Sequence, residues 1–165
     1  VSIAHITFSE KDIPDFNTNF KIIPPIRSES DCNSLKEGLI DGTIDYLTSM
    51  HEPYDIDHKK VVFDDASPGS IGLESMFGLM CNQFTLEKTI DILTRRKIIF
   101  EIDDHSIEVG SRANLSLFNP DKNYEFSDEH ILSSSKNCAY LGNKLKGVVY
   151  GSVNGDKLTL NKIWT

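Results

Sequence analysis

Residues 35–54 read LKEGLIDGTIDYLTSMHEPY, and this stretch carries the clearest indication of the fold. A helical stripe that includes Leu35 and Leu39 ends at Gly42, a residue type that commonly terminates helices. The apolar and β-branched residues of 43–49 then predict a buried strand, after which the sequence becomes polar. A helix, a strand and a polar loop in this order are typical of an α/β layer.

The same alternation continues on both sides of this stretch. Residues 1–8 are apolar enough for a buried strand, and residues 9–30 form a turn-rich loop with a rigid Pro-Pro pair. We expect Ser30 or Asp31 to cap the helix that follows. The first part of the chain therefore alternates strands with helices, which favours an α/β fold.

A long polar loop over residues 50–70 separates the predicted strand from two further helices. Loops of this length in compact domains are usually functional or disordered. Helical periodicity follows over 71–82 and 85–98, with Thr85 as the expected N-cap of the second helix.

The C-terminal third of the chain has a different character. Residues 114–118 alternate between polar and apolar side chains, as strands do. The pair Asn154-Gly155 stands between the strand-like runs 148–153 and 158–160, and Asn-Gly in this setting is a strong hairpin signal. We therefore predict that this part of the chain is mainly antiparallel β-structure.

Composition excludes several classes of partner. The chain has 165 residues, 39% of them hydrophobic, a net charge of −8 and a pI near 5.0. This mixture can bury a core, whereas the acidic charge argues against nucleic acid or an anionic membrane as a partner. Three widely spaced cysteines, Cys32, Cys81 and Cys138, do not suggest a disulfide framework. With no apolar run of roughly 18 residues, we expect a cytoplasmic location.

The polar loop contains imidazole and carboxylate side chains of the kind that bind metals, namely His51, Glu52, Asp55, Asp57 and His58. The zinc-protease motif H-E-x-x-H is not present, because its second histidine position is Asp55 and Pro53 would break the helix that the motif requires. Two interpretations remain open from the residues alone. One is a metal site, and the other is a solvated acidic loop with one or two hydrogen-bonded histidines.

Several segments together resemble one protein family. Residues 35–45 resemble the L-x-x-G-L-x-D-G-T-I-D stretch of dihydroorotases, and residues 49–54 resemble their D-H-A-P-H motif. Residues 16–27 are similar to the segment that contains Asn-Pro-Pro-Leu-Arg. Residues 63–75 are similar to F-x-x-A-x-x-G-x-x-G-L-E-T, and residues 110–120 to G-x-x-A-D-L-x-L-F-D-P. The matches occur in the family's order over nearly the whole chain.

The resemblance implies an α/β fold that is the C-terminal portion of a TIM-type (β/α)₈ barrel of a cyclic amidohydrolase, followed by a small antiparallel β-sandwich module. Residues 1–100 would form the last βα units of the barrel, and residues 101–165 the C-terminal β module. A complete barrel needs roughly 250 residues, so we expect a C-terminal fragment of a longer protein. Active sites of such barrels lie at the carboxyl ends of the strands, where 49–51 would be placed.

The same resemblance shows substitutions at positions that carry the family's chemistry. Met50 stands where the family has the metal-binding, proton-shuttling aspartate, and Ala4 stands where it has a metal-ligand histidine. A thioether neither accepts a proton nor serves as a hard metal ligand. The remnants of the substrate pocket implied by the resemblance are His51, Tyr54, Ile23, Arg27 and Gly69, of which Ile23 replaces an asparagine and Tyr54 a histidine.

These substitutions predict a non-catalytic dihydroorotase-like protein of pyrimidine biosynthesis, with a structural or partner-binding role. Active family members use zinc, but we expect no cofactor in this chain, since no catalytic group is intact. By family analogy, the expected partner is aspartate transcarbamoylase or a second copy of the protein. The alternative is an active zinc-dependent cyclic amidohydrolase when full length, with His51, Asp55 or Asp57 as replacement ligands. A third interpretation is a decayed gene product without a selected function.

Overall fold

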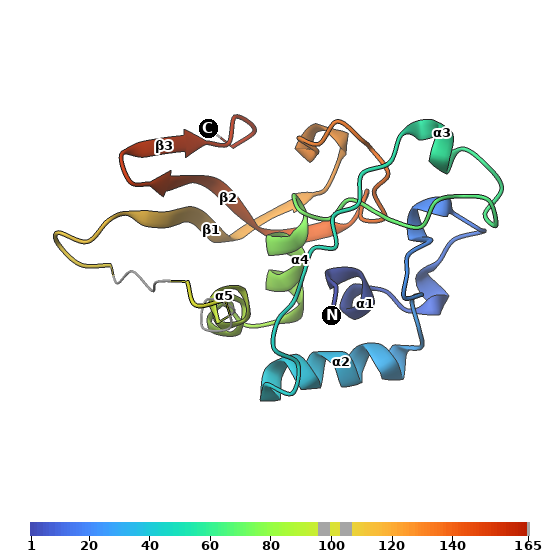
Figure 1. The fold of residues 1–165 in the computed structure, drawn as a ribbon, viewed down its shortest axis with the longest axis horizontal. Helices are drawn as coiled ribbons and strands as arrows, with labels where there is room; N and C mark the ends of the chain where they lie inside the picture. Colours follow the sequence, from blue (N-terminus) through green and yellow to red (C-terminus); the bar gives the residue numbers. More distant parts are fainter. Residues whose placement is uncertain (96–99, 103–106, 165) are drawn as a thin grey trace.

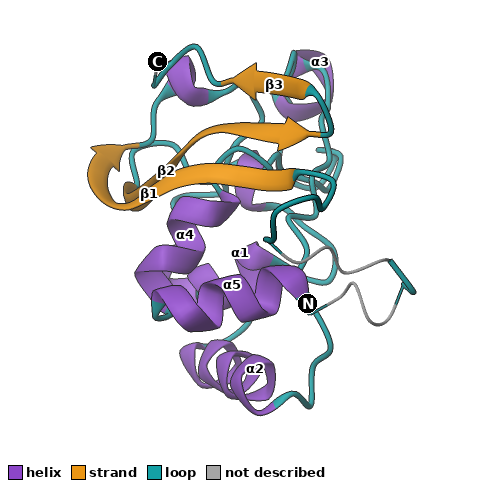
Figure 2. Cartoon of the chain, turned by 90° about the vertical axis from the view of Figure 1, so that its left-hand side faces the viewer, coloured by secondary structure: helices purple, strands orange, loops and turns teal. Residues whose placement is uncertain are grey.

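The structure, a computed structural model, describes residues 1–95, 100–102 and 107–164 (Figure 1). A three-stranded sheet forms one layer, and α1, α2, α4 and α5 lie on one side of it, with α4 next to the sheet and α2 farthest away (Figure 2). The helices and strands in chain order are α1 (Ile3–Thr7), α2 (Glu29–Asp41), α3 (Ile56–Lys59), α4 (Met76–Gln83), α5 (Leu86–Thr94), β1 (Asn114–Glu125), β2 (Lys144–Asn154) and β3 (Lys157–Leu160), with short 3₁₀ turns η1 (Glu10–Asp12), η2 (Thr18–Phe20) and η3 (Asp128–His130).

The helix predicted before Gly42 is confirmed as α2, but it begins earlier than expected. Ser28, rather than Ser30 or Asp31, is the N-cap, and its hydroxyl accepts a hydrogen bond from the Asp31 backbone N–H at 3.3 Å. The Asp31 carboxylate accepts in return from the Ser28 N–H at 3.1 Å, which completes a capping box. Gly42 ends the helix with φ of 89°, a left-handed conformation that glycine adopts without steric cost.

The prediction of a strand over residues 1–8 is mostly wrong. Ser2 alone forms a parallel bridge, to Thr48, and residues from Ile3 onward turn into α1. Both backbone hydrogen bonds of the bridge are 2.9 Å long, from the Ile3 N–H to the Thr48 oxygen and from the Thr48 N–H to the Val1 oxygen. A short apolar run fits a buried helix as well as a buried strand. The strand predicted over 43–49 is likewise reduced to the bridge at Thr48.

The polar segment after this bridge is organised by local structure and a second bridge. α3 is a single turn inside the predicted loop 50–70, and His51 pairs in parallel with Ser70. The helix predicted over 71–82 begins only at Met76, because the preceding residues form the turns that pass His51. Thr85 caps α5 as predicted, its hydroxyl accepting from the Lys88 N–H at 3.3 Å. Residues 96–98 of that predicted helix lie outside the described residues.

The C-terminal strands confirm the predicted antiparallel hairpin. The sheet order is β1-β2-β3, and Asn154 pairs with Lys157, so Gly155 and Asp156 are the turn residues instead of Asn154 and Gly155. Gly155 has φ of 61°, in the region that such turns require. The register between β1 and β2 shifts after the Leu117–Gly151 pair, where a bulge bends the sheet. The described residues form this one sheet, without the second layer of a sandwich.

The core lies between α4 and β2 and continues beneath α1. Gly78 lets α4 approach β2 closely, since a Cβ atom there would lie 3.0 Å from the Leu145 Cβ. Leu145 is 1% exposed and belongs to the same cluster as Ile3, Leu39 and Met80. Among the described residues, no helix has the length and apolar character needed to cross a membrane.

The contact between sheet and helices depends on Leu145. We predict that Leu145→Ala lowers the free energy of unfolding by about 2–5 kcal/mol, because the side chain is lost from a packed site that collapses only partly. Leu158→Ala is the matched control, since Leu158 is 58% exposed on β3 and its truncation should cost less than about 0.5 kcal/mol. Urea unfolding of the three chains checks this, and equal losses in the two variants would contradict it.

Candidate functional site

The segment that the sequence singles out, 49–54, runs between the two parallel bridges. Thr48 pairs with Ser2 before it, and His51 pairs with Ser70 within it. Met50 lies between these bridges with φ of 47°, and its backbone N–H donates to the Thr48 hydroxyl at 3.1 Å. A left-handed conformation is unfavourable for a long side chain and easier for Asp or Asn. The backbone at position 50 therefore suits aspartate, the residue that the motif resemblance implies there, better than methionine.

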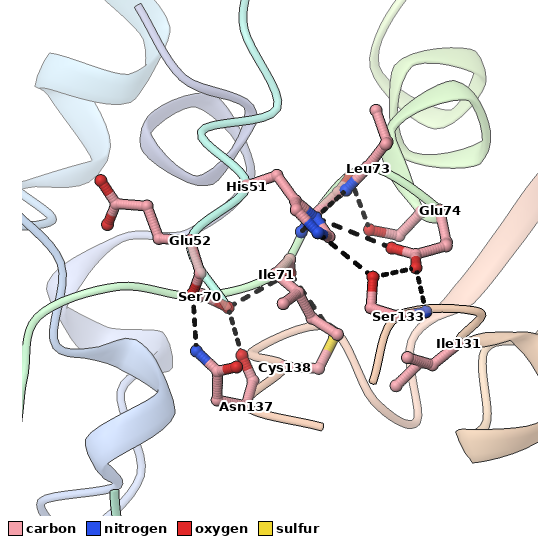
Figure 3. A network of polar contacts seen from close by, with 12 residues as sticks. His51, Glu52, Ser70, Ile71, Leu73, Glu74, Ile131, Ser133, Asn137 and Cys138 are labelled. Atoms are coloured by element: carbon pink, nitrogen blue, oxygen red, sulfur yellow. Dashed lines mark hydrogen bonds and ion pairs between the residues drawn. The ribbon is translucent and has the colours of Figure 1, made fainter. Parts of the chain in front are cut away.

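Asn137 joins this segment to its neighbours (Figure 3). Its side-chain N–H groups donate to the backbone oxygens of Glu52, at 2.9 Å, and Gly69, at 3.3 Å. Its side-chain oxygen accepts from the Tyr54 backbone N–H at 3.1 Å. The Asn137 backbone oxygen also accepts from the Ile71 N–H at 2.9 Å. One buried side chain thus satisfies backbone groups that a continuous sheet would otherwise pair.

His51 is fixed by hydrogen bonds to both ring nitrogens. Nδ1 accepts from the backbone N–H groups of Gly72, at 3.3 Å, and Leu73, at 3.2 Å. Nε2 must then carry the proton, which it donates to the Ser133 hydroxyl at 3.1 Å. The Ser133 hydroxyl in turn donates to Glu74 Oε1 at 2.5 Å (Figure 3). Both ring nitrogens of His51 are thus engaged, and Nδ1 also lies 3.8 Å from Glu74 Oε2.

Glu74 is the anionic end of this chain of hydrogen bonds. Burial alone would raise the pKa of its carboxyl, but hydrogen bonds from the Ser133 hydroxyl and backbone N–H, with a smaller contribution from His51, outweigh burial and lower the pKa below 4.5. The carboxylate is therefore ionised at neutral pH and holds the 133–137 loop against the turn before α4.

Ala4 and Met50, the two positions where the resemblance implies a lost metal ligand, lie in different surroundings. Ala4 is 4% exposed within α1 and packs in the core. Met50 lines an apolar pocket of about 630 Å³ with Pro24, Arg27 and His5. His5 is itself engaged, with Nδ1 2.6 Å from the Ser2 hydroxyl and Nε2 2.7 Å from the Pro24 oxygen. His5 is therefore a buried histidine whose two ring nitrogens are both hydrogen-bonded.

The other predicted pocket residues do not form one site. Ile23 is 63% exposed, whereas Arg27 lines the Met50 pocket. Tyr54 and Gly69 contact each other elsewhere, since a Cβ atom on Gly69 would lie 2.7 Å from the Tyr54 ring and 2.7 Å from the Glu52 carboxylate. Gly69 also has φ of 147°, so a side chain there is excluded by space and by backbone conformation.

The residues present do not fit the zinc site that the family resemblance implies. The described ranges contain no group of three or more His, Cys, Asp or Glu side chains that could hold a metal ion. Both nitrogens of His51 are occupied by other partners, Ala4 offers no donor, and Met50 offers a soft thioether. Asp55 and Asp57, the replacement ligands considered from the sequence, are not brought together with His51 in such a group.

Sequence reasoning missed Asn137 and Ser133, which hold the site together. Both belong to the run Ser133–Asn137, which has no hydrophobic periodicity and matches no motif. Glu74 lies within the stretch 63–75 that resembles the family, but the resemblance implies no contact between it and Ser133. A polar loop of this kind shows its role only once the segments that it contacts are close in space.

Comparison with solved structures defines the class of fold. No family model matches the chain. The L-hydantoinase (dihydropyrimidinase) from Arthrobacter aurescens superimposes with a TM-score of 0.83 and 21% identity, over 98% of this chain and 38% of that one. The inactive dihydroorotase-like domain of the Chaetomium thermophilum CAD-like multifunctional protein superimposes with a TM-score of 0.63 and 20% identity, over 96% of this chain and 42% of that one. The fold is that of the C-terminal part of amidohydrolase TIM-barrel proteins.

Comparison with curated proteins defines the family. The dihydroorotase of Caldicellulosiruptor saccharolyticus is 34% identical over 93% of this chain. The chain belongs to the dihydroorotase family, as the motif resemblance predicted. It spans 37% of the length of that relative.

The hydrogen bonds to Glu74 predict a specific pH dependence. Because the pKa of Glu74 is lowered by folding, its stabilising contribution is complete above about pH 4.5 and is lost as the pH falls through the folded-state value. Glu74→Gln should lower the free energy of unfolding by about 1–3 kcal/mol at pH 7. It should also make the loss of stability between pH 5 and pH 3 shallower than in the unsubstituted chain.

Glu37→Gln is the matched control, because Glu37 is exposed on α2. This control should keep the acid slope of the unsubstituted chain in urea titrations at each pH. An undiminished slope in Glu74→Gln would contradict the assignment of Glu74 as the group that loses its proton.

Proposed function

We propose that this chain is part of a non-catalytic dihydroorotase-like protein of pyrimidine biosynthesis, with a structural or partner-binding role. The proposal rests on two residues of the segment after Thr48, Met50 and His51. Met50 cannot shuttle a proton there, and the nitrogens of the adjacent His51 are both committed to neighbouring groups. Positioned acid–base groups contribute roughly 10²–10⁴ to rate, and a methionine thioether at position 50 cannot supply this contribution.

The retained features support a selected structural role over decay. The capping box of α2, the close approach at Gly78 and the hydrogen bonds of Asn137 are all intact. A chain under no selection would be expected to lose such features, because most substitutions destabilise. By analogy with its family, the partner would be aspartate transcarbamoylase or a second copy, and the location would be the cytoplasm. The three-stranded sheet would then be one layer of the C-terminal sandwich.

An active zinc-dependent dihydroorotase is the second candidate, and the 34% identity to a dihydroorotase favours it. The structural neighbour described as an inactive dihydroorotase-like domain favours the first, since this fold is compatible with loss of activity. Metal content and turnover separate the two candidates directly.

We expect the full-length protein that contains this chain to bind less than stoichiometric zinc and to show no turnover of dihydroorotate above the blank. The reason is the loss of donors at Ala4 and Met50. The Caldicellulosiruptor saccharolyticus dihydroorotase, and its variant with methionine at the position matching Met50, serve as the active and disabled controls. Stoichiometric zinc together with turnover would establish the second candidate and exclude the first.

We further expect that Met50→Asp alone will not restore activity. The substitution returns a carboxylate to the segment, but Ala4 still offers no ligand and Ile23 cannot hydrogen-bond a substrate as asparagine does. The same zinc and turnover assays on the full-length variant check this expectation. Measurable turnover in the single variant would show that position 50 was the only missing catalytic group.

A further inference from the structure

A polar pocket beside α3 is separate from the apolar pocket that Met50 lines, and Tyr54 is the one replaced family position among its lining residues. It has a volume of about 460 Å³ and is bounded by η2, the segment 54–60 and the segment 134–137. Ala4, Ile23, Arg27 and Met50 do not line it. The pocket therefore needs an explanation of its own.

The charge of this pocket is opposite to that of the whole chain. Lys59, Lys60 and Lys136 line it against one carboxylate, Asp55, so three positive charges and one negative charge leave a local charge of +2. The chain as a whole carries −8. Charges of one sign gathered in a concave site concentrate ligands of the opposite sign.

Lys59 is the buried cation of the pocket, with a relative exposure of 5%. Its ammonium donates to the backbone oxygens of Ser67 and Gly69, both at 2.9 Å, which leaves one of its three N–H groups without a partner. Among the described residues, no carboxylate pairs with it within 4.0 Å. Burial, followed by the nearby charge of Lys21, lowers the pKa of Lys59, although Glu52 acts in the opposite direction. A buried ammonium without a counterion is costly unless an anion accompanies it.

Other donors around the pocket are also unused. Four further residues line the pocket, namely Tyr54, Lys60, Ser134 and Ser135. Their side-chain hydroxyl and ammonium groups make no hydrogen bond or ion pair with described residues. Lys136 differs, because its ammonium donates to the Ile131 oxygen at 2.9 Å. The lining thus combines a buried cation with several free N–H and O–H donors.

We propose that this pocket binds a small oxyanion, a phosphate or a carboxylate, through Lys59, Lys60, Tyr54 and Ser134. Oxyanions accept charge-assisted hydrogen bonds from ammonium and hydroxyl donors of the kind gathered here. The volume exceeds that of a single phosphate group, so there is room for a small substituent on the anion. The site does not depend on the proposed function, because it uses neither Met50 nor a metal.

The test is a titration of the chain with inorganic phosphate and, separately, with succinate, followed by amide NMR shifts. We expect saturable shifts in residues 54–60 and 134–137 with at least one of the two anions. Tighter binding of phosphate would identify a phosphorylated ligand, and tighter binding of succinate a carboxylate ligand; both results support the oxyanion site.

Lys60→Gln, Tyr54→Phe and Ser134→Ala should each weaken binding about five- to tenfold, because each removes one donor to a charged group. Lys157→Gln is the matched control, since it removes an equal charge from exposed β3, and it should change the affinity less than about twofold. The proposal is overturned if neither anion gives saturable shifts, or if Lys157→Gln weakens binding as much as Lys60→Gln. Tyr54→Phe keeps the ring that packs beside Gly69, so the fold is preserved in that variant.

Discussion

The rest of the structure depends on the hydrogen bonds of Asn137. The segments around Glu52 and Gly69 lie side by side, yet the parallel pairing between them is limited to one bridge, at His51 and Ser70. Buried backbone groups must find partners, and the Asn137 side chain supplies them by bonding to Glu52, Tyr54 and Gly69. In this way a loop from the C-terminal half of the chain holds together segments that, in a complete barrel, would be expected to end in parallel strands.

The same loop determines what His51 can do. Ser133, four residues before Asn137, accepts from His51 and donates to Glu74, while backbone N–H groups occupy the other ring nitrogen. A histidine held on both sides is a structural link between loops. The residue next to Met50 thus has a structural role in this fold.

Local signals in the sequence were reliable where a few adjacent residues decide the conformation. Gly42 ends α2, Thr85 caps α5 and Gly155 turns the β2–β3 hairpin, because caps and tight turns depend on φ and on hydrogen bonds within four residues. The strands predicted over 1–8 and 43–49 were wrong, since an apolar run is compatible with either a helix or a strand until its partners are known.

The sequence by itself determined the family and the order of its motifs, because these depend only on which residue stands at which position. Only the tertiary structure decided that His51 is occupied on both nitrogens and that Lys59 is buried without a counterion. The physical reason is distance along the chain. Ser133 lies 82 residues from His51, and no local pattern encodes a hydrogen bond between side chains so far apart.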